Sequence, residues 1–245
     1  MTNQIILFDM DGVLLFPGGY AEALKSSVKR VGLALGMPSS GLTDDHIARF
    51  EALSITNEWD TLAICTALIL LEVWRSNPQV RLNSMTPNKE IYATQSPHYD
   101  DFLDTFSNIG SLPSSSAYEK IIQDHPALDV SQKTSLKKLL FNTRDIYKSP
   151  VLKYHQETVL GSESFQENYR LMPQLGVNSC LLEYDQPALS TKTKKCLRTW
   201  LSKDGHKAGI MTNRPSRTPP DYLSSPEAEL GAKLVGLSDL QILGS

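Results

Sequence analysis

Apolar residues form two short continuous runs that each end abruptly in polar residues. The runs are Ile5 to Phe8 and Ala208 to Met211. A continuous apolar run of this length, bounded by polar residues and glycine, is typical of a strand buried in a parallel sheet. The pattern predicts two such strands, and a third over Lys233 to Leu237.

Most of the sequence between the two runs has a helical pattern. Apolar residues recur at intervals of three and four, and several segments start at a capping residue or stop at glycine. The predicted helices cover residues 21–35, 43–53, 58–74, 99–106, 131–147 and 163–171. Residues 76–116 have little periodicity and contain Pro78, Pro87, Pro97 and Pro113, so loops are predicted around the short helix at 99–106.

After residue 184, predicted helices alternate with predicted strands. Thr191 to Lys203 is predicted to be a helix that Gly205 stops. The loop 214–226 is rich in proline and is predicted to be stiff. Ser225, Pro226 and Glu227 have the order of an N-cap, a first helical residue and an acid suited to the helix dipole. This helix is predicted to run to about Ala232 and to lead into the third strand.

The two apolar runs lie about 200 residues apart, whereas neighbouring strands of an α/β sheet are usually joined by much shorter connections. We therefore predict an α/β fold with a parallel sheet, built from residues 1–16 and 184–245. A large, mainly α-helical domain over residues 17–183 is inserted into it. The alternative interpretation of the insertion is an independent helical domain with its own role.

Composition and charge limit which binding partners and which cellular compartment are expected. The net charge of −3 and pI near 6.0 give no electrostatic reason to expect nucleic acid or an anionic membrane as partner. Three cysteines and five scattered histidines show neither a disulfide framework nor metal-ligand spacing, so a reducing cytoplasm is expected. No signal peptide is visible, and the most apolar stretch, Ala63 to Leu71, is far shorter than the ~20 residues that span a bilayer. The histidines are expected at the surface or in the helical domain.

The residues after the first apolar run carry the strongest chemical signal. Asp9 and Asp11 lie at the carboxyl end of the predicted strand, and Gly12 permits a sharp turn. Open α/β sheets bind ligands at this end, and charges beside so apolar a segment need a partner, most simply a cation. The segment Ile5 to Val13 resembles the first motif of the haloacid dehalogenase-like (HAD) hydrolases, in the Asp-x-Asp-Gly-Val form of their phosphatases. The alternative is a polar turn with two solvated acids.

The second apolar run ends in a hydroxyl group. Gly205 to Pro215 resembles the second motif of the same family, a strand that ends in Thr or Ser and is often followed by Asn. The Thr212 hydroxyl and nearby backbone N–H groups are suited to a phosphate oxygen. By itself this segment also fits a strand followed by a proline turn. Together the two motifs favour a HAD-like, Rossmann-like core in three layers, with the helical insertion as its cap.

The resemblance implies Mg²⁺-dependent hydrolysis of a small phosphorylated metabolite. Asp9 would be the nucleophile and form an aspartyl-phosphate, while Asp11 would protonate the leaving group and then activate water. Mg²⁺ would lie between Asp9 and the phosphate, and the position of Asp11 would reach the ion through its backbone carbonyl. Thr212, Asn213 and Gly12 would bind the phosphate. Family members that cleave carbon–halogen bonds lack the second acid, because a halide needs no proton, so Asp11 favours phosphate substrates.

The sequence also departs from the family pattern. A lysine beyond the third strand and an acidic pair after the fourth are expected, but only residues 238–245 follow the predicted third strand. Lys233 lies too early and Asp239 stands alone. Either the chain is a truncated hydrolase, or it is a short member that binds a phosphorylated ligand or a partner without turnover. The stop directly after the apolar run Leu240 to Leu243 favours truncation. A third interpretation is phosphoryl transfer to an acceptor other than water.

One polar cluster in the predicted cap has two interpretations. Asn57, Glu58, Trp59 and Asp60 open the apolar helix 58–74, and similar clusters face the leaving group in some HAD caps. The simpler interpretation is an N-cap asparagine with acids in the first helical turn. No residue argues for a particular oligomeric state.

Overall fold

The computed structural model describes residues 3–82, 84–107, 112–217 and 225–244. The chain forms two compact units. The first, which we call the α/β unit, combines Met1–Tyr20 with Val159–Ser245, and the second, the helical unit, is Ala21–Thr158. The predicted core (1–16 and 184–245) and cap (17–183) are defined by their functions, whereas these units are defined by compactness. The division into core and cap therefore stays a prediction.

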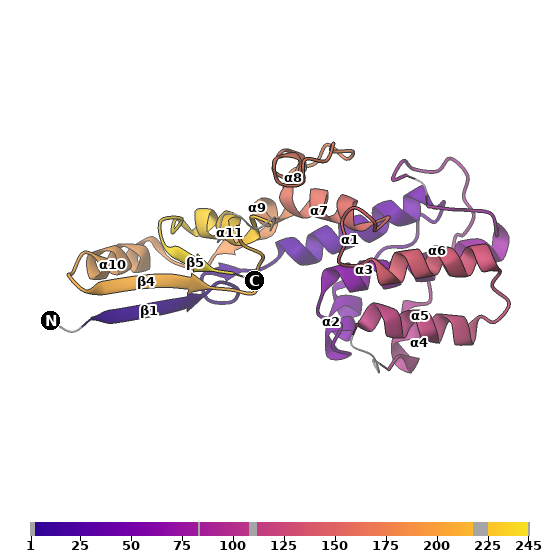
Figure 1. Cartoon of the computed structure of the whole chain (residues 1–245), viewed down its shortest axis with the longest axis horizontal. Coiled ribbons are helices and arrows are strands. Elements are labelled where there is room, and N and C mark those ends of the chain that lie inside the picture. Colours follow the sequence, from indigo (N-terminus) through magenta and orange to yellow (C-terminus); the bar gives the residue numbers. More distant parts are fainter. Residues whose placement is uncertain (1–2, 83, 108–111, 218–224, 245) are drawn as a thin grey trace. The chain divides into compact units, whose positions relative to one another are not determined.

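The α/β unit contains a three-stranded parallel sheet (Figure 1). Its strands are β1 (Gln4–Asp9), β4 (His206–Met211) and β5 (Gln241–Leu243), in the order β1-β4-β5. Leu7 pairs with Gly209 and Asp9 with Met211, which in turn pairs with Leu243. The predicted α/β class, with a parallel sheet and a large helical part, is confirmed, and so are the first two predicted strands.

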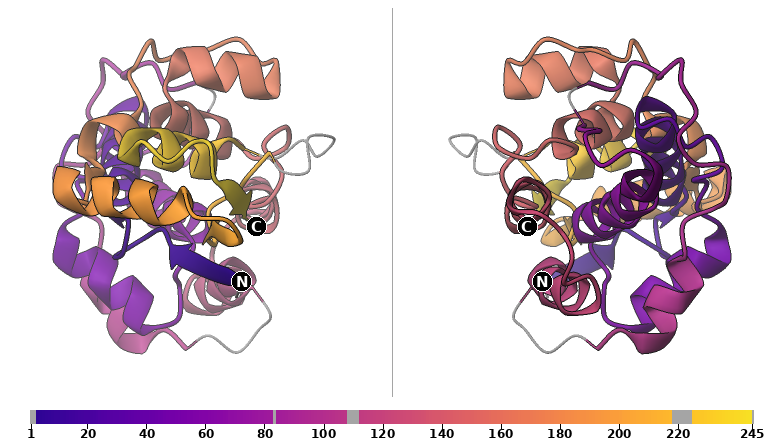
Figure 2. Two further views of the ribbon diagram at one scale, coloured as in Figure 1. Left: turned by 90° about the vertical axis from the view of Figure 1, so that its left-hand side faces the viewer. Right: turned by 90° about the vertical axis from the view of Figure 1, so that its right-hand side faces the viewer.

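Two helices cover one face of this sheet. Figures 1 and 2 show α10 (Thr191–Leu201) and α11 (Glu227–Val235) on the same side of the strands. The core beneath them is apolar and fully or nearly buried; it includes Met10, Leu15, Leu197, Ile210, Ala232, Val235 and Ile242. On the opposite face, Ile5, Leu7, Met211 and Leu243 are between 48% and 69% exposed. In the described part of the chain, the sheet is therefore covered on one side.

The predicted third strand is wrong. Residues 233–235 continue α11, and the helix ends at Gly236, whose φ of 74° lets its N–H bond back to the carbonyls of Ala232 and Lys233. Val235 and Leu237 are buried because they face the core from the end of this helix and the following turn. The strand is instead Gln241–Leu243. It was overlooked because three residues are too short to show a period.

The start of α11 also differs slightly from the prediction. Pro226, rather than Ser225, occupies the N-cap position, and Glu227 is the first helical residue. Of the predicted stiff loop 214–226, residues 218–224 lie outside the described residues. The predicted helix 191–203 is confirmed as α10, with Ser190 as its side-chain cap.

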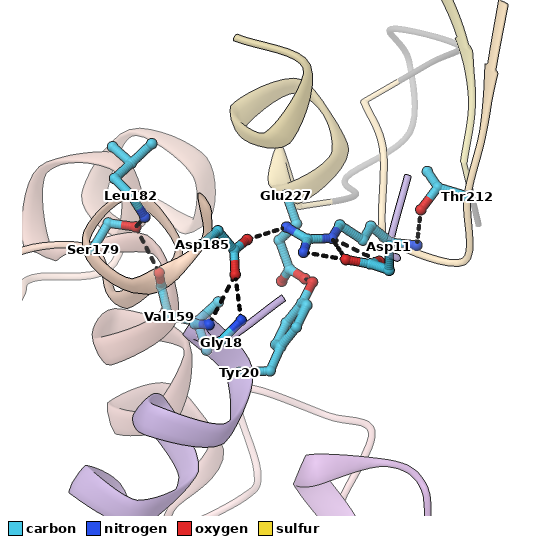
Figure 3. Close-up of polar contacts among 11 residues, drawn as sticks. Asp11, Gly18, Tyr20, Val159, Ser179, Leu182, Asp185, Thr212 and Glu227 are labelled. Atoms are coloured by element: carbon cyan, nitrogen blue, oxygen red, sulfur yellow. Dashed lines mark hydrogen bonds and ion pairs between the residues drawn. The ribbon is translucent and has the colours of Figure 1, made fainter. Parts of the chain in front are cut away.

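Short elements complete the α/β unit. Strand β2 (Leu15–Phe16) pairs antiparallel with β3 (Gln186–Pro187). Helix α8 (Ser162–Tyr169) matches the predicted helix at 163–171, whereas α9 (Cys180–Tyr184) was not predicted. The Ser179 hydroxyl caps α9 by accepting from the N–H of Leu182, and it donates to the carbonyl of Val159 (Figure 3).

The helical unit is built around one buried helix. Helix α3 (Glu58–Ser76) is buried along most of its length, as the apolar run predicts. It packs against α5 (Pro113–Asp124) and α6 (Val130–Phe141). The other helices with residues in this unit are α1 (Gly19–Ala34), α2 (Asp44–Ala52), α4 (Tyr99–Thr105) and α7 (Leu152–Leu160). No helix in the described residues is long and apolar enough to cross a membrane.

Side-chain caps explain where the helices start. The Thr43 hydroxyl accepts from the backbone N–H of His46 to cap α2. Asn57 caps α3 by accepting from the N–H of Trp59, which confirms the N-cap interpretation. Asp60, on the first turn of α3, is buried and accepts two hydrogen bonds from Arg144.

Other helix boundaries were missed. Helix α5 starts in the stretch 76–116 that was predicted to be rich in loops, because Pro113 is a first-turn residue rather than a breaker. Residues 83 and 108–111 of that stretch lie outside the described residues. Helix α7 was not predicted. Helix α6 ends at Phe141 rather than near 147, since Asn142 caps it and the Asp145 carboxylate accepts from the N–H groups of the next turn.

All three cysteines are free, as predicted. Cys65 and Cys180 are buried, and Cys196 is exposed on α10. His155 belongs to the helical unit, one of the two locations expected for the histidines, and it is fully buried there. Its Nδ1 lies 3.1 Å from the Ser27 hydroxyl, and its Nε2 has no partner in the described residues. Burial lowers the pKa of His155 to about 4.

His155 makes the stability of the chain sensitive to acid. The unfolded chain binds a proton near the ordinary pKa of 6.5, whereas the folded chain resists it down to about 4. The contribution of neutral His155 to the free energy of unfolding is therefore fully present above this window. It is lost as the pH falls through the window, by up to about 3 kcal/mol. The variant His155→Gln should lose less unfolding free energy than the wild type between neutral pH and pH 4, as measured by urea unfolding. Parallel pH profiles would contradict this.

Candidate functional site

The predicted site residues follow two neighbouring strands. Strand β1 ends at Asp9, which pairs with Met211, the last residue of β4. Because the strands are parallel, Asp9 and Asp11 emerge at the same edge of the sheet as Thr212 and Asn213. The structure therefore brings the two predicted motifs to one edge, at the carboxyl ends of the strands.

The turn after β1 depends on its glycine. Gly12 has a φ of 79°, a conformation that favours glycine, and its N–H donates to the carbonyl of Leu15 at 2.8 Å. The N–H groups of Leu14 and Leu15 both donate to the Met10 carbonyl. Asp9 is exposed, and its Oδ1 accepts from the N–H of Met10 at 2.7 Å. The turn thus places an exposed Asp9 and a partly exposed Asp11 on either side of the buried Met10.

Thr212 is held firmly at the end of β4. Its N–H donates to the Leu243 carbonyl at 3.0 Å, which extends the pairing with β5. The side chain is buried, and its Oγ1 accepts from the N–H of Arg214 at 3.1 Å. This bond uses a lone pair of the hydroxyl and leaves its O–H to donate. Asn213 is exposed in the turn between them.

The buried Arg214 connects this edge of the sheet with Asp185, the residue before β3 (Figure 3). The Nε of Arg214 donates to Asp11, with Oδ1 at 3.1 Å and Oδ2 at 3.0 Å, and Nη2 also donates to Oδ1. Nη1 donates to Oδ2 of Asp185 at 2.7 Å. The side chains of Arg214 and Asp185 are only 2% and 1% exposed, and that of Asp11 is 37% exposed.

The second carboxylate of this network is anchored to the backbone. Oδ1 of Asp185 accepts from the N–H groups of Gly18 and Gly19 at 2.9 and 2.8 Å. Gly19 has no room for a side chain, since a Cβ there would lie 2.6 Å from the Cα of Leu181. Glycine thus allows the chain to approach Asp185 closely.

An aromatic ring completes the surroundings of the guanidinium. The Cζ of Arg214 lies 5.1 Å from the centre of the Tyr20 ring, whose hydroxyl donates to Glu227. Burial lowers the pKa of Arg214, but the hydrogen bond with Asp11 and the nearby negative charges raise it more. The net effect is a pKa above the ordinary arginine value, so the side chain stays charged.

Sequence reasoning missed four of these residues. Arg214 lies within the second motif, Gly205 to Pro215, so the sequence shows its position beside Thr212. The sequence does not show its two acidic partners. Tyr20 and Asp185 come from segments without any recognisable motif, and Glu227 was predicted only as an acid at the start of a helix. Only the folded chain brings these residues together around Arg214.

Proteins usually bind Mg²⁺ through one or two carboxylates together with substrate phosphate and water. Among the described residues, no group of three His, Cys, Asp or Glu side chains is arranged to hold a metal ion. Asp9 offers an exposed carboxylate, but both side-chain oxygens of Asp11 accept from Arg214. An ion at this edge would therefore have Asp9 as its exposed carboxylate ligand, with substrate and water completing its coordination.

Comparisons with known proteins give a likeness of fold. No protein-family model and no curated protein match the sequence. An X-ray structure of a Northeast Structural Genomics Consortium target matches with a TM-score of 0.65 at 17% identity, over 99% of this chain and 70% of that chain. Phosphatase Tt82 from Thermococcus thioreducens matches with a TM-score of 0.56 at 13% identity, over 98% of this chain and 72% of that chain. The fold is therefore similar to that of a phosphatase.

Asp185 should contribute strongly to stability. The variant Asp185→Ala removes the acceptor of Gly18, Gly19 and one arm of a buried guanidinium, and should lower the unfolding free energy by about 3 kcal/mol or more. The matched control is Asp239→Ala, which breaks an exposed pair with Arg198 and should cost less than about 1 kcal/mol. Urea unfolding followed by circular dichroism measures both. Equal losses would contradict a structural role for the buried pair.

Proposed function

We propose that this protein is a HAD-like, Mg²⁺-dependent phosphatase that hydrolyses a small phosphomonoester through an aspartyl-phosphate. The main support is the edge of the sheet at which β1 delivers Asp9 and Asp11 and the parallel neighbour β4 delivers Thr212. The similarity of the fold to a phosphatase adds to it.

The proposed reaction has two steps. An oxygen of Asp9 attacks phosphorus, the bond from phosphorus to the alcohol oxygen breaks, and protonated Asp11 gives its proton to that oxygen. Water then attacks the phosphorus of the aspartyl-phosphate and loses a proton to the Asp11 carboxylate, while the bond to Asp9 breaks. The products are an alcohol and inorganic phosphate, and both acids return to their starting states.

The remaining residues of the motifs would bind the phosphate. The Thr212 hydroxyl keeps its O–H for donation to a phosphate oxygen, and the exposed turn at Asn213 and the open backbone at Gly12 offer further polar groups. Gly12 suits close approach of a ligand, because the space beside its Cα is empty. Asp9 and the backbone carbonyl of Asp11 would hold Mg²⁺, which would supply positive charge between two anions.

The helical unit is the proposed cap of this enzyme. In this role it would select the substrate and exclude water from the reaction. A small phosphorylated metabolite is the proposed substrate, with no nucleic acid or membrane as partner. The competing interpretation is a module that binds phospholigands without turnover.

Replacing the nucleophile tests the proposal directly. Asp9→Asn should reduce hydrolysis of phosphomonoesters by more than about 10³-fold, since the amide cannot form the phosphoenzyme. The measurement is phosphate release from a panel of phosphomonoesters. The matched control is Asp204→Asn, which changes an exposed acid in the turn before β4 and should leave the rate unchanged. Saturable phosphate binding by a wild type that shows no turnover would favour the binding module.

Removal of metal tests the cofactor separately. Treatment with EDTA should abolish phosphate release and added Mg²⁺ should restore it, because the phosphate and Asp9 repel each other without a cation. Phosphate release in the same panel is the measurement. Activity that depends on Asp9 but persists in EDTA would refute the metal while leaving the hydrolase standing.

A further inference from the structure

Arg214 is placed to act on protein groups rather than on a substrate. Its side chain is 2% exposed, and its Nε, Nη1 and Nη2 donate to Asp11 and Asp185. A cation that binds a phosphate needs N–H groups that face the ligand. These contacts indicate that this arginine acts on Asp11.

The contact with Asp11 fixes the orientation of a carboxylate. Nε lies close to both oxygens, and Nη2 is bonded to Oδ1, so the guanidinium lies along one edge of the group. A carboxylate has about four lone-pair sites. Arg214 occupies those on one edge, while the Asp11 side chain is 37% exposed and keeps the others accessible.

The guanidinium is itself immobilised. Asp185 holds Nη1 at 2.7 Å, and Gly18 and Gly19 hold Asp185 through their backbone N–H groups. The Tyr20 ring lies against the guanidinium. A continuous series of contacts thus runs from the backbone of Gly18 and Gly19 through two buried charges to Asp11. Figure 3 shows the labelled Gly18, Asp185 and Asp11 along it.

We propose that Arg214 is a positioning residue, which orients the Asp11 carboxyl group for its two proton transfers in the hydrolysis proposed above. The inference rests on that proposed function. Arg214 itself exchanges no proton and acts only through Asp11. Its exposed counterpart Arg198, which pairs with Asp239 on the surface of the same unit, has no such role.

A positioning role has a kinetic signature that a purely structural role lacks. Protonation of the leaving oxygen matters greatly for phenyl phosphate, whose phenolate is a poor leaving group. It matters much less for para-nitrophenyl phosphate, whose leaving group is stabilised by the nitro substituent. The two substrates have nearly the same shape, so selection by the cap cancels in the ratio of their rates.

The experiment measures kcat and KM for both substrates in the full chain. Asp11→Asn defines the signature, with a loss of kcat/KM on phenyl phosphate that exceeds the loss on para-nitrophenyl phosphate by about 100-fold. Arg214→Gln should show the same selective loss, by about tenfold, and carried mainly by kcat. Arg198→Gln is the matched control and should leave both substrates unaffected.

Each outcome decides between the interpretations. Equal losses on both substrates in Arg214→Gln would overturn the positioning role and leave the hydrolase intact. Absence of any Asp9-dependent hydrolysis in the wild type would overturn the proposed function, and this inference with it. If Arg214→Gln does not fold, as judged by circular dichroism, Arg214→Lys takes its place. Lysine keeps the charge but cannot span both oxygens, so a smaller selective loss supports the inference and its absence contradicts it.

Discussion

The α/β unit is organised around one buried positive charge. A guanidinium removed from water is stable only if its hydrogen bonds are satisfied by well-placed partners, preferably of opposite charge. Arg214 meets this requirement with Asp11 after β1 and Asp185 before β3. Because removing either partner would leave a buried charge uncompensated, the turn after β1, the start of α1 and the segment after β4 have to fold together.

Much of this unit could be predicted from local patterns. The apolar runs before Asp9 and Thr212 are strands, as their length and composition predict. The predicted burial of the first run is wrong, because helices cover only one face of the described sheet and Ile5 and Leu7 are exposed on the other. Since parallel strands end at the same edge, the proximity of the two motifs followed from the fold class. In the helical unit, Thr43 and Asn57 start their helices as capping rules predict.

The errors come from residues whose role depends on distant partners. Val235 and Leu237 look like strand residues in sequence, but the cap at Gly236 and the core beneath α11 decide their structure. A three-residue strand such as β5 has no period of its own. Asp185 gives no sign of its burial, because its partners Gly18, Gly19 and Arg214 lie in other segments. Pairings of this kind are set by tertiary structure and cannot be read locally.

The order of the strands gives the two halves of the candidate site unequal mechanical support. Thr212 follows β4, which is hydrogen-bonded on both sides, whereas Asp9 ends β1, which lies at the edge and presents Ile5 and Leu7 to solvent. Opening of β1 breaks one ladder and exposes less buried surface than opening of β4. Local unfolding therefore disassembles the site from its acidic side first. Beyond the ladder itself, that side is restrained by the buried Met10 and by the contact between Asp11 and Arg214.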